Sequence, residues 1–192
     1  MAAPDPSHPA GDPHPLLPVI PLMGATLRSI GEQARHPMVV TDARGTVLWH
    51  DEHSSPARHA WTCAASPVRC PDHGDVIGAV DVAAGRSRFH PSTLALVTAA
   101  AQLAEGHLRT RQVLDDDRVL ARHLPLLTAL DGAPGALLAA SGRVIEARPA
   151  GWLPARVALP AHGDRVALGA AGTGLLEPLP ECYLLRLTGT GA

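Results

Sequence analysis

The sequence has no Lys and no Asn, so all sixteen of its basic residues are Arg. Both missing residues have A-rich codons, so their absence reflects a GC-rich source genome rather than a function. Aromatic residues make up only 3% of the 192 residues, so a core has to be built from Ala, Leu and Val. Hydrophobic residues still make up 46% of the chain, which is enough for a globular core.

Several other features are scarce, and each scarcity excludes a class of protein. The net charge is -2, and a near-neutral chain lacks the basic face of a free-standing nucleic-acid binder. Three Cys are too few for a disulfide framework. No apolar run reaches the roughly twenty residues of a membrane span, and the first residues do not resemble a secretory signal. We therefore expect a cytoplasmic protein with reduced thiols, without direct contact with nucleic acid or membrane.

The first part of the chain alternates between proline-rich and apolar segments. Residues 1–18 contain six Pro, which predicts a disordered tail. Apolar residues at helical spacing then predict a helix over Pro21–Ala34. That helix ends at His36-Pro37, because the residue before a proline avoids the α region.

Four short β-type runs come after this helix. Met38–Thr41 and Thr46–Trp49 enclose a turn that contains Gly45, a pattern typical of a hairpin. Ala60–Val68 and Val76–Ala83 lie on either side of a turn rich in Pro, Asp and Gly. The sequence therefore predicts two strand pairs in succession.

A long helix is predicted from Ser92, which is a suitable N-cap. Its apolar residues are spaced by three- and four-residue steps, as in a heptad repeat: Leu94, Val97, Ala101, Ala104 and Leu108. This seam either packs against the chain's own sheet or faces a second copy. We expect the run Asp115–Asp117 to be solvated or to break the helix, which resumes over Arg118–Leu130.

The remainder of the sequence predicts a small β-rich module over residues 135–190, because short β-type runs alternate with Gly and Pro. These runs are Gly135–Ala140, Arg143–Ala147, Val157–Leu159, Arg165–Leu168, Gly174–Leu176 and Tyr183–Leu187.

Taken together, several motifs resemble the sensory region of actinobacterial GAF-containing transcriptional regulators, which are related to acetoin-type activators. The matching pieces are HPLLPVI (14–20), VVTDARGTVLW (39–49), AWTCAA (60–65) with PV (67–68), VIGAVDV (76–82) and HPSTLALVTAAAQLAE (90–105). HLPLL (123–127), SGRV (141–144) and PAGWLP (149–154) resemble the segment C-terminal to the GAF domain in that group. The resemblance implies an α+β fold, in which a reduced GAF-like antiparallel sheet is flanked by helices and succeeded by the small β-rich module.

The sequence departs from this family at two places. Family members have several tens of residues between the hairpin and the second strand pair, including helices that cover the ligand pocket, whereas here only Asp51–His59 remains. Family members also continue into a helix-turn-helix output domain, and no such pattern is present up to Ala192. We therefore expect a disordered tail at 1–18, a truncated GAF-like domain at 19–130 and the β-rich module at 135–190.

These expectations point to a set of candidate binding residues. A remodelled small-molecule pocket would lie near Val40, Trp49, Trp61, Cys63 and Val80, although Trp49 and Trp61 are more often packing residues than ligand contacts. The resemblance places Cys63 at a buried strand position. Zinc prefers closely spaced Cys and His ligands, so Cys63, Cys70 and His73 are an alternative metal set. We expect no metal and no cofactor, because exposed turn histidines beside an apolar core explain the same pattern.

No residue pattern supports an enzyme. The Cys residues lack an electropositive, open setting, and the segment from Gly169 to Gly172 lacks the Lys and helix of a phosphate-binding loop. The preferred hypothesis is a non-enzymatic regulatory or interaction module. It forms a homodimer through the helical seam or pairs with a full-length GAF-type regulator. A small-molecule sensor, a redox or metal switch, and a decayed gene product without maintained function remain as alternatives.

Overall fold

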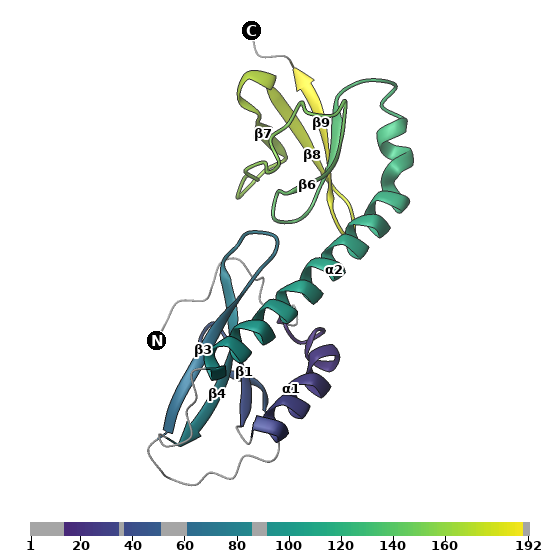
Figure 1. Ribbon diagram of the computed structural model, residues 1–192. Coiled ribbons are helices and arrows are strands. Elements are labelled where there is room, and N and C mark those ends of the chain that lie inside the picture. The colour runs from purple at the N-terminus through teal and green to yellow at the C-terminus, as the bar shows by residue number, and fades with distance from the viewer. Residues whose placement is uncertain (1–13, 35–36, 51–60, 86–91, 190–192) are drawn as a thin grey trace. The chain divides into compact units, whose positions relative to one another are not determined.

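The computed structural model describes residues 14–34, 37–50, 61–85 and 92–189. Within these ranges it contains two α-helices and two antiparallel sheets, which confirms the predicted α+β class (Figure 1). The chain divides into two compact units, unit 1 (residues 1–110) and unit 2 (residues 111–192). Helix α2, Ser92–Thr128, contributes residues to both units, and the predicted domain ranges stay a prediction.

Unit 1 is built on a four-stranded antiparallel sheet. Its strands are β1 (Met38–Asp42), β2 (Val47–His50), β3 (Trp61–Arg69) and β4 (Val76–Gly85). Their order in space is β2-β1-β4-β3, so the hairpin and the second strand pair join through β1 and β4 (Figure 1). Helix α1, Ile20–Ala34, precedes β1. The two predicted strand pairs and the predicted first helix are therefore present.

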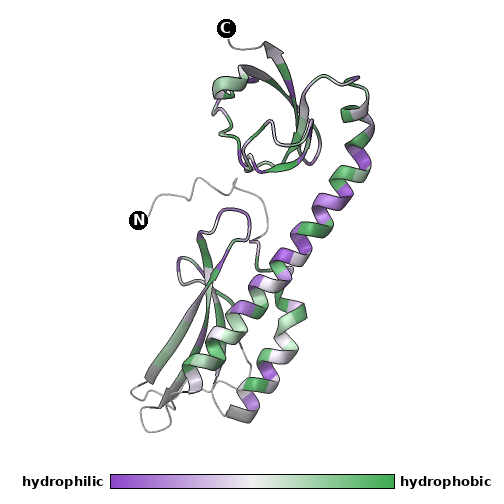
Figure 2. Cartoon of the chain, turned by 45° about the horizontal axis from the view of Figure 1, so that its top comes forward, coloured by the Kyte–Doolittle hydropathy of each residue, from purple (hydrophilic) through white to green (hydrophobic). Residues whose placement is uncertain are grey.

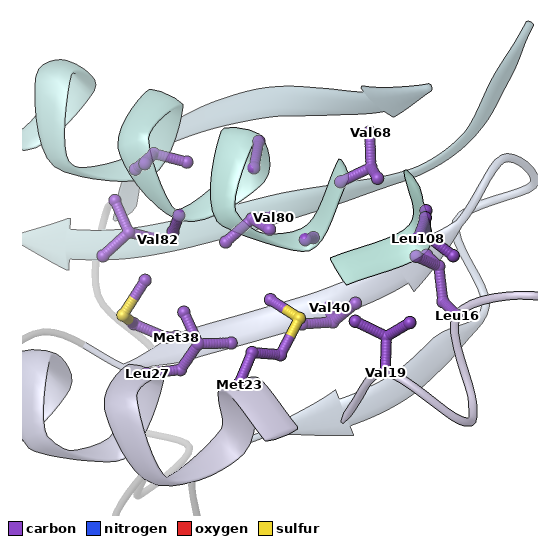
Figure 3. Packing of buried hydrophobic residues seen from close by; sticks show 14 of the residues in the cluster. Leu16, Val19, Met23, Leu27, Met38, Val40, Val68, Val80, Val82 and Leu108 are labelled. Atoms are coloured by element: carbon purple, nitrogen blue, oxygen red, sulfur yellow. The ribbon is translucent and has the colours of Figure 1, made fainter. Parts of the chain in front are cut away.

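Both helices pack on the same face of this sheet and form one apolar cluster with it (Figure 3). The main contributors are Met23 and Leu27 from α1, Met38 and Val40 from β1, Val68 from β3, Val80 and Val82 from β4, and Val97, Ala101, Ala104 and Leu108 from α2. Burying one large apolar side chain is worth about 1.5–3 kcal/mol. The cluster is therefore what fixes α1 and α2 on the sheet.

The N-terminal tail predicted over residues 1–18 lies outside the described residues up to position 13. Residues 15–19 form turns, and Leu16 is only 1% exposed because it packs in the core of unit 1. Leu16 reaches Gly78 of β4, where an added Cβ would lie 2.6 Å from Leu16 Cδ1 and would also contact the carbonyl oxygen of Thr41. Only a residue without a side chain fits under Leu16.

The turn between β1 and β2 is closed by Asp42. Its Oδ1 accepts hydrogen bonds from the backbone N–H groups of Arg44 and Thr46, at N···O distances of 2.8 and 2.7 Å. Gly45 has φ 85°, a conformation that glycine adopts without strain. Burial acts to raise the pKa of the Asp42 carboxyl, but hydrogen bonds from Thr46 and Arg44 and the charge of His14 outweigh it and lower the pKa.

Unit 2 contains a five-stranded antiparallel sheet in the order β6-β5-β9-β8-β7. The strands are β5 (Gly135–Leu138), β6 (Val144–Arg148), β7 (Arg165–Ala167), β8 (Thr173–Pro178) and β9 (Tyr183–Gly189). On one face, Leu137 and Leu184 cluster with Val119 and Leu127 of α2. On the other face, a second cluster includes Leu138 and Leu185, against which the partly buried Trp152 packs. Unit 2 thus has apolar cover on both faces of its sheet.

One prediction for this half of the chain is wrong, and another is decided between its two alternatives. Asp115–Asp117 does not break helix α2: Asp115 and Asp117 are exposed on it, and arginines neutralise two of the three carboxylates. Asp115 pairs with Arg118 at 2.6 Å, and Asp116 accepts hydrogen bonds from both Nη atoms of Arg143 at 2.8 Å. Figure 2 shows how hydrophilic residues gather along this middle stretch of α2. Residues 157–159 form no strand, although Val157 is buried.

Replacing Gly78 by Ala tests the packing of Leu16 on the sheet. We expect the free energy of unfolding to fall by about 1–3 kcal/mol, because the new methyl group would displace Leu16 or the backbone of Thr41. Urea denaturation measures this change. Gly106→Ala is the matched control: nothing lies within 4 Å of the added Cβ, and Ala in a helix should raise stability by roughly 0.5–1 kcal/mol. A Gly78→Ala variant as stable as the parent would contradict the close contact.

Replacing Asp42 by Ala tests the hairpin turn. A carboxyl whose pKa is lower in the folded state stabilises the fold above its ordinary pKa of 3.8, and this contribution disappears as the pH falls through the folded value. Near neutral pH we expect Asp42→Ala to cost about 1 kcal/mol, the net worth of one hydrogen bond at an exposed site. Thermal unfolding at several pH values measures this. Asp42→Asn keeps an acceptor oxygen and should lose only the pH dependence; equal pH profiles for parent and Asp42→Asn would refute the assignment.

Candidate functional site

One face of the unit 1 sheet is covered by α1 and α2, and the strand register shows which residues lie on the opposite face. Paired residues of an antiparallel sheet point to the same side. Val39 pairs with Asp81, which pairs with Ala65, and Thr41 pairs with Ala79, which pairs with Pro67. Ala83 pairs with Cys63. We call these eight residues the open face: Val39, Thr41, Cys63, Ala65, Pro67, Ala79, Asp81 and Ala83.

These eight residues are apolar except at the centre of the face, and on the β2 edge the exposed Val47 and His50 lie on the same side, because they pair with Thr41 and Val39. Six of the eight side chains are apolar or Cys, and none of the described helices of unit 1 packs on them. Thr41 Oγ1 donates a hydrogen bond to Asp81 Oδ2 at 3.2 Å, so the two polar groups among the eight residues are joined to each other. Cys63, Ala65 and Pro67 are exposed, whereas the residues of β1 and β4 are half-buried by their neighbours.

This composition is unusual for a solvated sheet face. An antiparallel sheet with one face on a core normally presents polar side chains on the other. A contiguous exposed apolar surface is instead typical of a binding surface. The small side chains Ala65, Ala79 and Ala83 also make the face flat, so another layer can approach the backbone closely. The open face is therefore the candidate site of unit 1.

The structure divides the predicted ligand-binding residues between the two faces. Val40 and Val80 are 1% and 0% exposed in the helix-covered core, and Trp49 packs on that core, with Nε1 3.6 Å from an ideal Cβ at Gly24. Cys63 lies on the open face. Trp61 belongs to β3, but its side chain lies outside the described residues.

The expectation that Cys63 is buried is wrong, because the structure exposes this thiol. Its neighbour Ala64 is the buried residue at this point of β3, since it pairs with the core residue Val82. Ser66 and Val68 lie on the same side as Ala64, at the two-residue period of a strand. Because side chains alternate along β3, Cys63 points away from the core, next to the buried Ala64.

The helical seam predicted as a dimer interface lies inside the chain's own core. Val97, Ala101 and Ala104 are at most 2% exposed and Leu108 is 7% exposed, all within the cluster that joins α2 to the sheet. Only Leu94, at 52%, presents a large part of its side chain to solvent. A buried side chain has no surface left for a second copy, so the first of the two interpretations of the seam holds.

The alternative metal set is not brought together. Cys63 lies in β3, whereas Cys70 and His73 lie after that strand in the turn to β4, where His73 Nδ1 is 2.8 Å from Asp75 Oδ2. Among the residues that the structure describes, no group of three or more His, Cys, Asp or Glu is arranged to hold a metal ion. His53 and His59 lie outside the described residues.

The Thr41–Asp81 pair was not predicted from the sequence. A signal for it was present, because Asp81 stands between two valines in VIGAVDV and must face away from them in a strand. The ion pair between Asp116 and Arg143 was also missed, since the two residues are far apart in sequence.

Three comparisons with known proteins bear on this geometry. The family model "GAF domain" matches residues 9–108, which is more than half of the chain. A 47.3 kDa protein described as uncharacterized, from the thcA 5' region of Rhodococcus erythropolis, is 37% identical over 79 residues. The alignment covers 37% of this chain and 18% of that protein.

Two further relatives carry descriptive names. A "signal-transduction and transcriptional-control protein" of Clostridium beijerinckii is 35% identical over 66 residues, 34% of this chain and 10% of that protein. The "acetoin dehydrogenase operon transcriptional activator AcoR" of Bacillus subtilis strain 168 is 35% identical over 81 residues, 38% of this chain and 13% of that protein. The matched segments therefore span less than a fifth of each of these three relatives.

One solved structure resembles the chain only weakly. The structure titled as the E. coli DhaR(N)-DhaL complex has a TM-score of 0.40 and 14% sequence identity, over 91% of this chain and 90% of that one. In the described part of the chain, no helix has the length and apolar character needed to cross a membrane.

Thiol labelling tests the placement of the cysteines. Cys182 is 4% exposed, and burial, together with the negative charge of Glu181, raises the pKa of its thiol. We expect iodoacetamide to modify Cys63 of the folded protein much faster than Cys182, because only an accessible thiolate reacts. Peptide mass spectrometry of a labelling time course gives both rates, and labelling in urea is the control for intrinsic reactivity. Equal labelling rates in the folded protein would contradict the placement of Cys63 on the exposed side of β3.

Proposed function

Because the chain belongs to the GAF domain family, we propose that it is a regulatory module that acts by binding another protein chain through the open face. The observation that carries this proposal is the apolar surface of the unit 1 sheet on which none of the described helices packs. The preferred occupant is a second copy of the chain. A full-length GAF-type regulator presents a related sheet and is the alternative partner.

The relatives support the regulatory part of the proposal. Two of them are named for transcriptional control, and one of these is a transcriptional activator of the acetoin dehydrogenase operon. Since the matched segments cover only 10% and 13% of those proteins, their targets and effectors are not transferred. We transfer only the general role of these relatives and propose that this chain is a non-enzymatic regulatory protein of the cytoplasm.

The proposal moves the interface from the helical seam to the sheet. The seam is occupied by the chain's own core, whereas the open face has exposed apolar side chains in β3. A closed dimer with twofold symmetry uses the same patch on both subunits. Two copies of the open face can form such a dimer. Their small side chains let the two sheets stack at the normal spacing of about 10 Å.

A charge placed on the open face tests the proposal. Ala65 is exposed and pairs with Asp81 at the centre of the face, so Ala65→Glu would place a second carboxylate beside Asp81 in the dimer without disturbing the core. We expect native mass spectrometry to show a dimer for the parent and a monomer for Ala65→Glu, with a dissociation constant raised by at least about a hundredfold. Circular dichroism confirms that the variant is folded.

Ala99→Glu is the matched control, because Ala99 is exposed on α2 and is not part of the open face. We expect this variant to remain a dimer. A monomeric parent would reject self-association, and a parent dimer lost in Ala99→Glu but kept in Ala65→Glu would place the interface on the helix instead.

A small-molecule sensor is the second candidate function, and the Thr41–Asp81 pair favours it. Ligand sites are mostly apolar and contain a few placed polar groups that orient the ligand. The Asp81 carboxylate accepts a hydrogen bond from the Thr41 hydroxyl and lies within an apolar surface. This arrangement suits a ligand with an apolar body and a hydrogen-bond donor or cation. Such a ligand would occupy the same face as a second chain, so the two functions compete for one surface.

The same spectra distinguish these functions. A sensor predicts a monomer with an added mass of a few hundred daltons or less when the protein is purified from its own host, and this mass should disappear on denaturation. Asp81→Asn keeps the size of the side chain but removes its charge, and should weaken the adduct without creating a dimer. A dimer that carries no added mass rejects the sensor in favour of the interaction module.

A further inference from the structure

Strand β3 is the last strand on one side of the unit 1 sheet. It is nine residues long and stands at the end of the order β2-β1-β4-β3, so β4 is its only strand partner in the part of the chain that the structure describes. The outer side of an edge strand presents backbone N–H and C=O groups that can pair with another chain. The residues whose backbone groups point outward therefore decide what can bind there.

Two hydrogen bonds fix the direction in which the backbone groups of β3 point. Successive residues of a strand in an antiparallel pair direct these groups alternately toward the partner strand and away from it. The N–H of Cys70 points inward, because it donates to the carbonyl oxygen of Asp75 at 2.9 Å across the turn to β4. The N–H of Arg69 points away from β4 and donates to Glu105 Oε1 of α2, also at 2.9 Å. The outward set continues back along the strand: Pro67, Ala65, Cys63 and Trp61.

One half of this edge is closed and the other half is open. The N–H of Arg69 is occupied by its bond to α2, and Pro67 has no N–H to donate. A proline is tolerated in a strand where its nitrogen faces away from the neighbouring strand, which agrees with the outward position of residue 67. Among the described residues, the outward groups of Trp61, Cys63 and Ala65 have no partner strand.

We propose that this open half pairs with the same segment of a second copy, antiparallel and centred on Cys63. Cys63 then lies opposite Cys63 of the other copy, and Trp61 lies opposite Ala65. Each outward N–H meets a carbonyl oxygen, which gives about six hydrogen bonds over the two copies. A shift of the pairing toward Pro67 would place its ring, in place of a donor, against a carbonyl oxygen. Trp61–Val68 contains no charged residue, so no charge on the strand repels a second copy.

The edge contact is separate from the open face and does not depend on what binds that face. It uses backbone groups in the plane of the sheet, and its twofold axis stands perpendicular to the sheet. Stacking of two open faces uses side chains, and its twofold axis lies parallel to the sheets. Because perpendicular twofold axes generate a closed tetramer, one chain can make both contacts. The edge contact consists of hydrogen bonds of modest net worth, so we expect it to form at the higher protein concentrations.

Amide hydrogen exchange of the full chain, measured residue by residue by NMR, tests the pairing because it reports on backbone N–H groups. We expect the amides of Cys63 and Ala65 to exchange at least about tenfold more slowly at high than at low protein concentration. The amides of Ala64 and Ser66 point toward β4 and serve as the internal reference, since they should be protected at both concentrations. A Cys63 amide that exchanges fast at every concentration overturns the proposal.

Ala65→Pro removes one outward donor without breaking a hydrogen bond to β4. We expect the Cys63 amide of this variant to exchange fast at all concentrations. Ala65→Val is the matched control, because it adds bulk on the same face but keeps its N–H, and it should slow like the parent. Cys63→Pro, measured at the Ala65 amide, is the second variant if Ala65→Pro does not fold. Full slowing in either proline variant overturns the proposal.

Ala65→Glu distinguishes this contact from the open face, because it adds a charge to the face but keeps the outward N–H. Loss of the stacked dimer in Ala65→Glu, with slow exchange of Cys63 retained at high concentration, supports the edge contact. A parent that forms a dimer while its Cys63 amide stays fast rejects the edge contact and leaves the proposed function of the open face intact.

Discussion

The packing of both unit 1 helices on a single face of a four-stranded sheet is the constraint on which the rest of this structure depends. Because strand side chains alternate, the burial of Val40, Val80 and Val82 under the helices assigns their neighbours to the other face. That face is then neither core nor normal surface, since apolar side chains surround the linked pair Thr41 and Asp81. The site is a direct consequence of the fold.

The hairpins of unit 1 were predictable from the sequence, but the side of β3 that faces the core was not. In β1 and β4 the large valines mark the core face, and Asp81 marks the opposite face. In β3 both alternating sets are small, with Cys63, Ala65 and Pro67 in one and Ala64, Ser66 and Val68 in the other. Nothing in the composition of β3 itself distinguishes them, and only the pairing with β4 decides that Ala64 is buried.

Helix α2 shows a similar limit. Val97, Ala101, Ala104 and Leu108 were recognised as an apolar seam, but heptad spacing is the same whether a helix packs on its own sheet or on a second copy. The acidic run, expected either to be solvated or to interrupt the helix, does not interrupt it, because Asp115 pairs with Arg118 and Asp116 pairs with Arg143. The second pair joins residues 27 positions apart, and local sequence patterns carry no information about such a contact.

The central claim is that the open face is where unit 1 binds a partner chain. Carbene footprinting of the full chain, at concentrations below and above that at which copies associate, tests it most directly because it measures side-chain exposure residue by residue. We predict that Val39, Ala65 and Pro67 lose labelling on association, whereas Ala99 and Leu103 on the outer side of α2 do not. Protection of the α2 residues with an unchanged open face would contradict the claim.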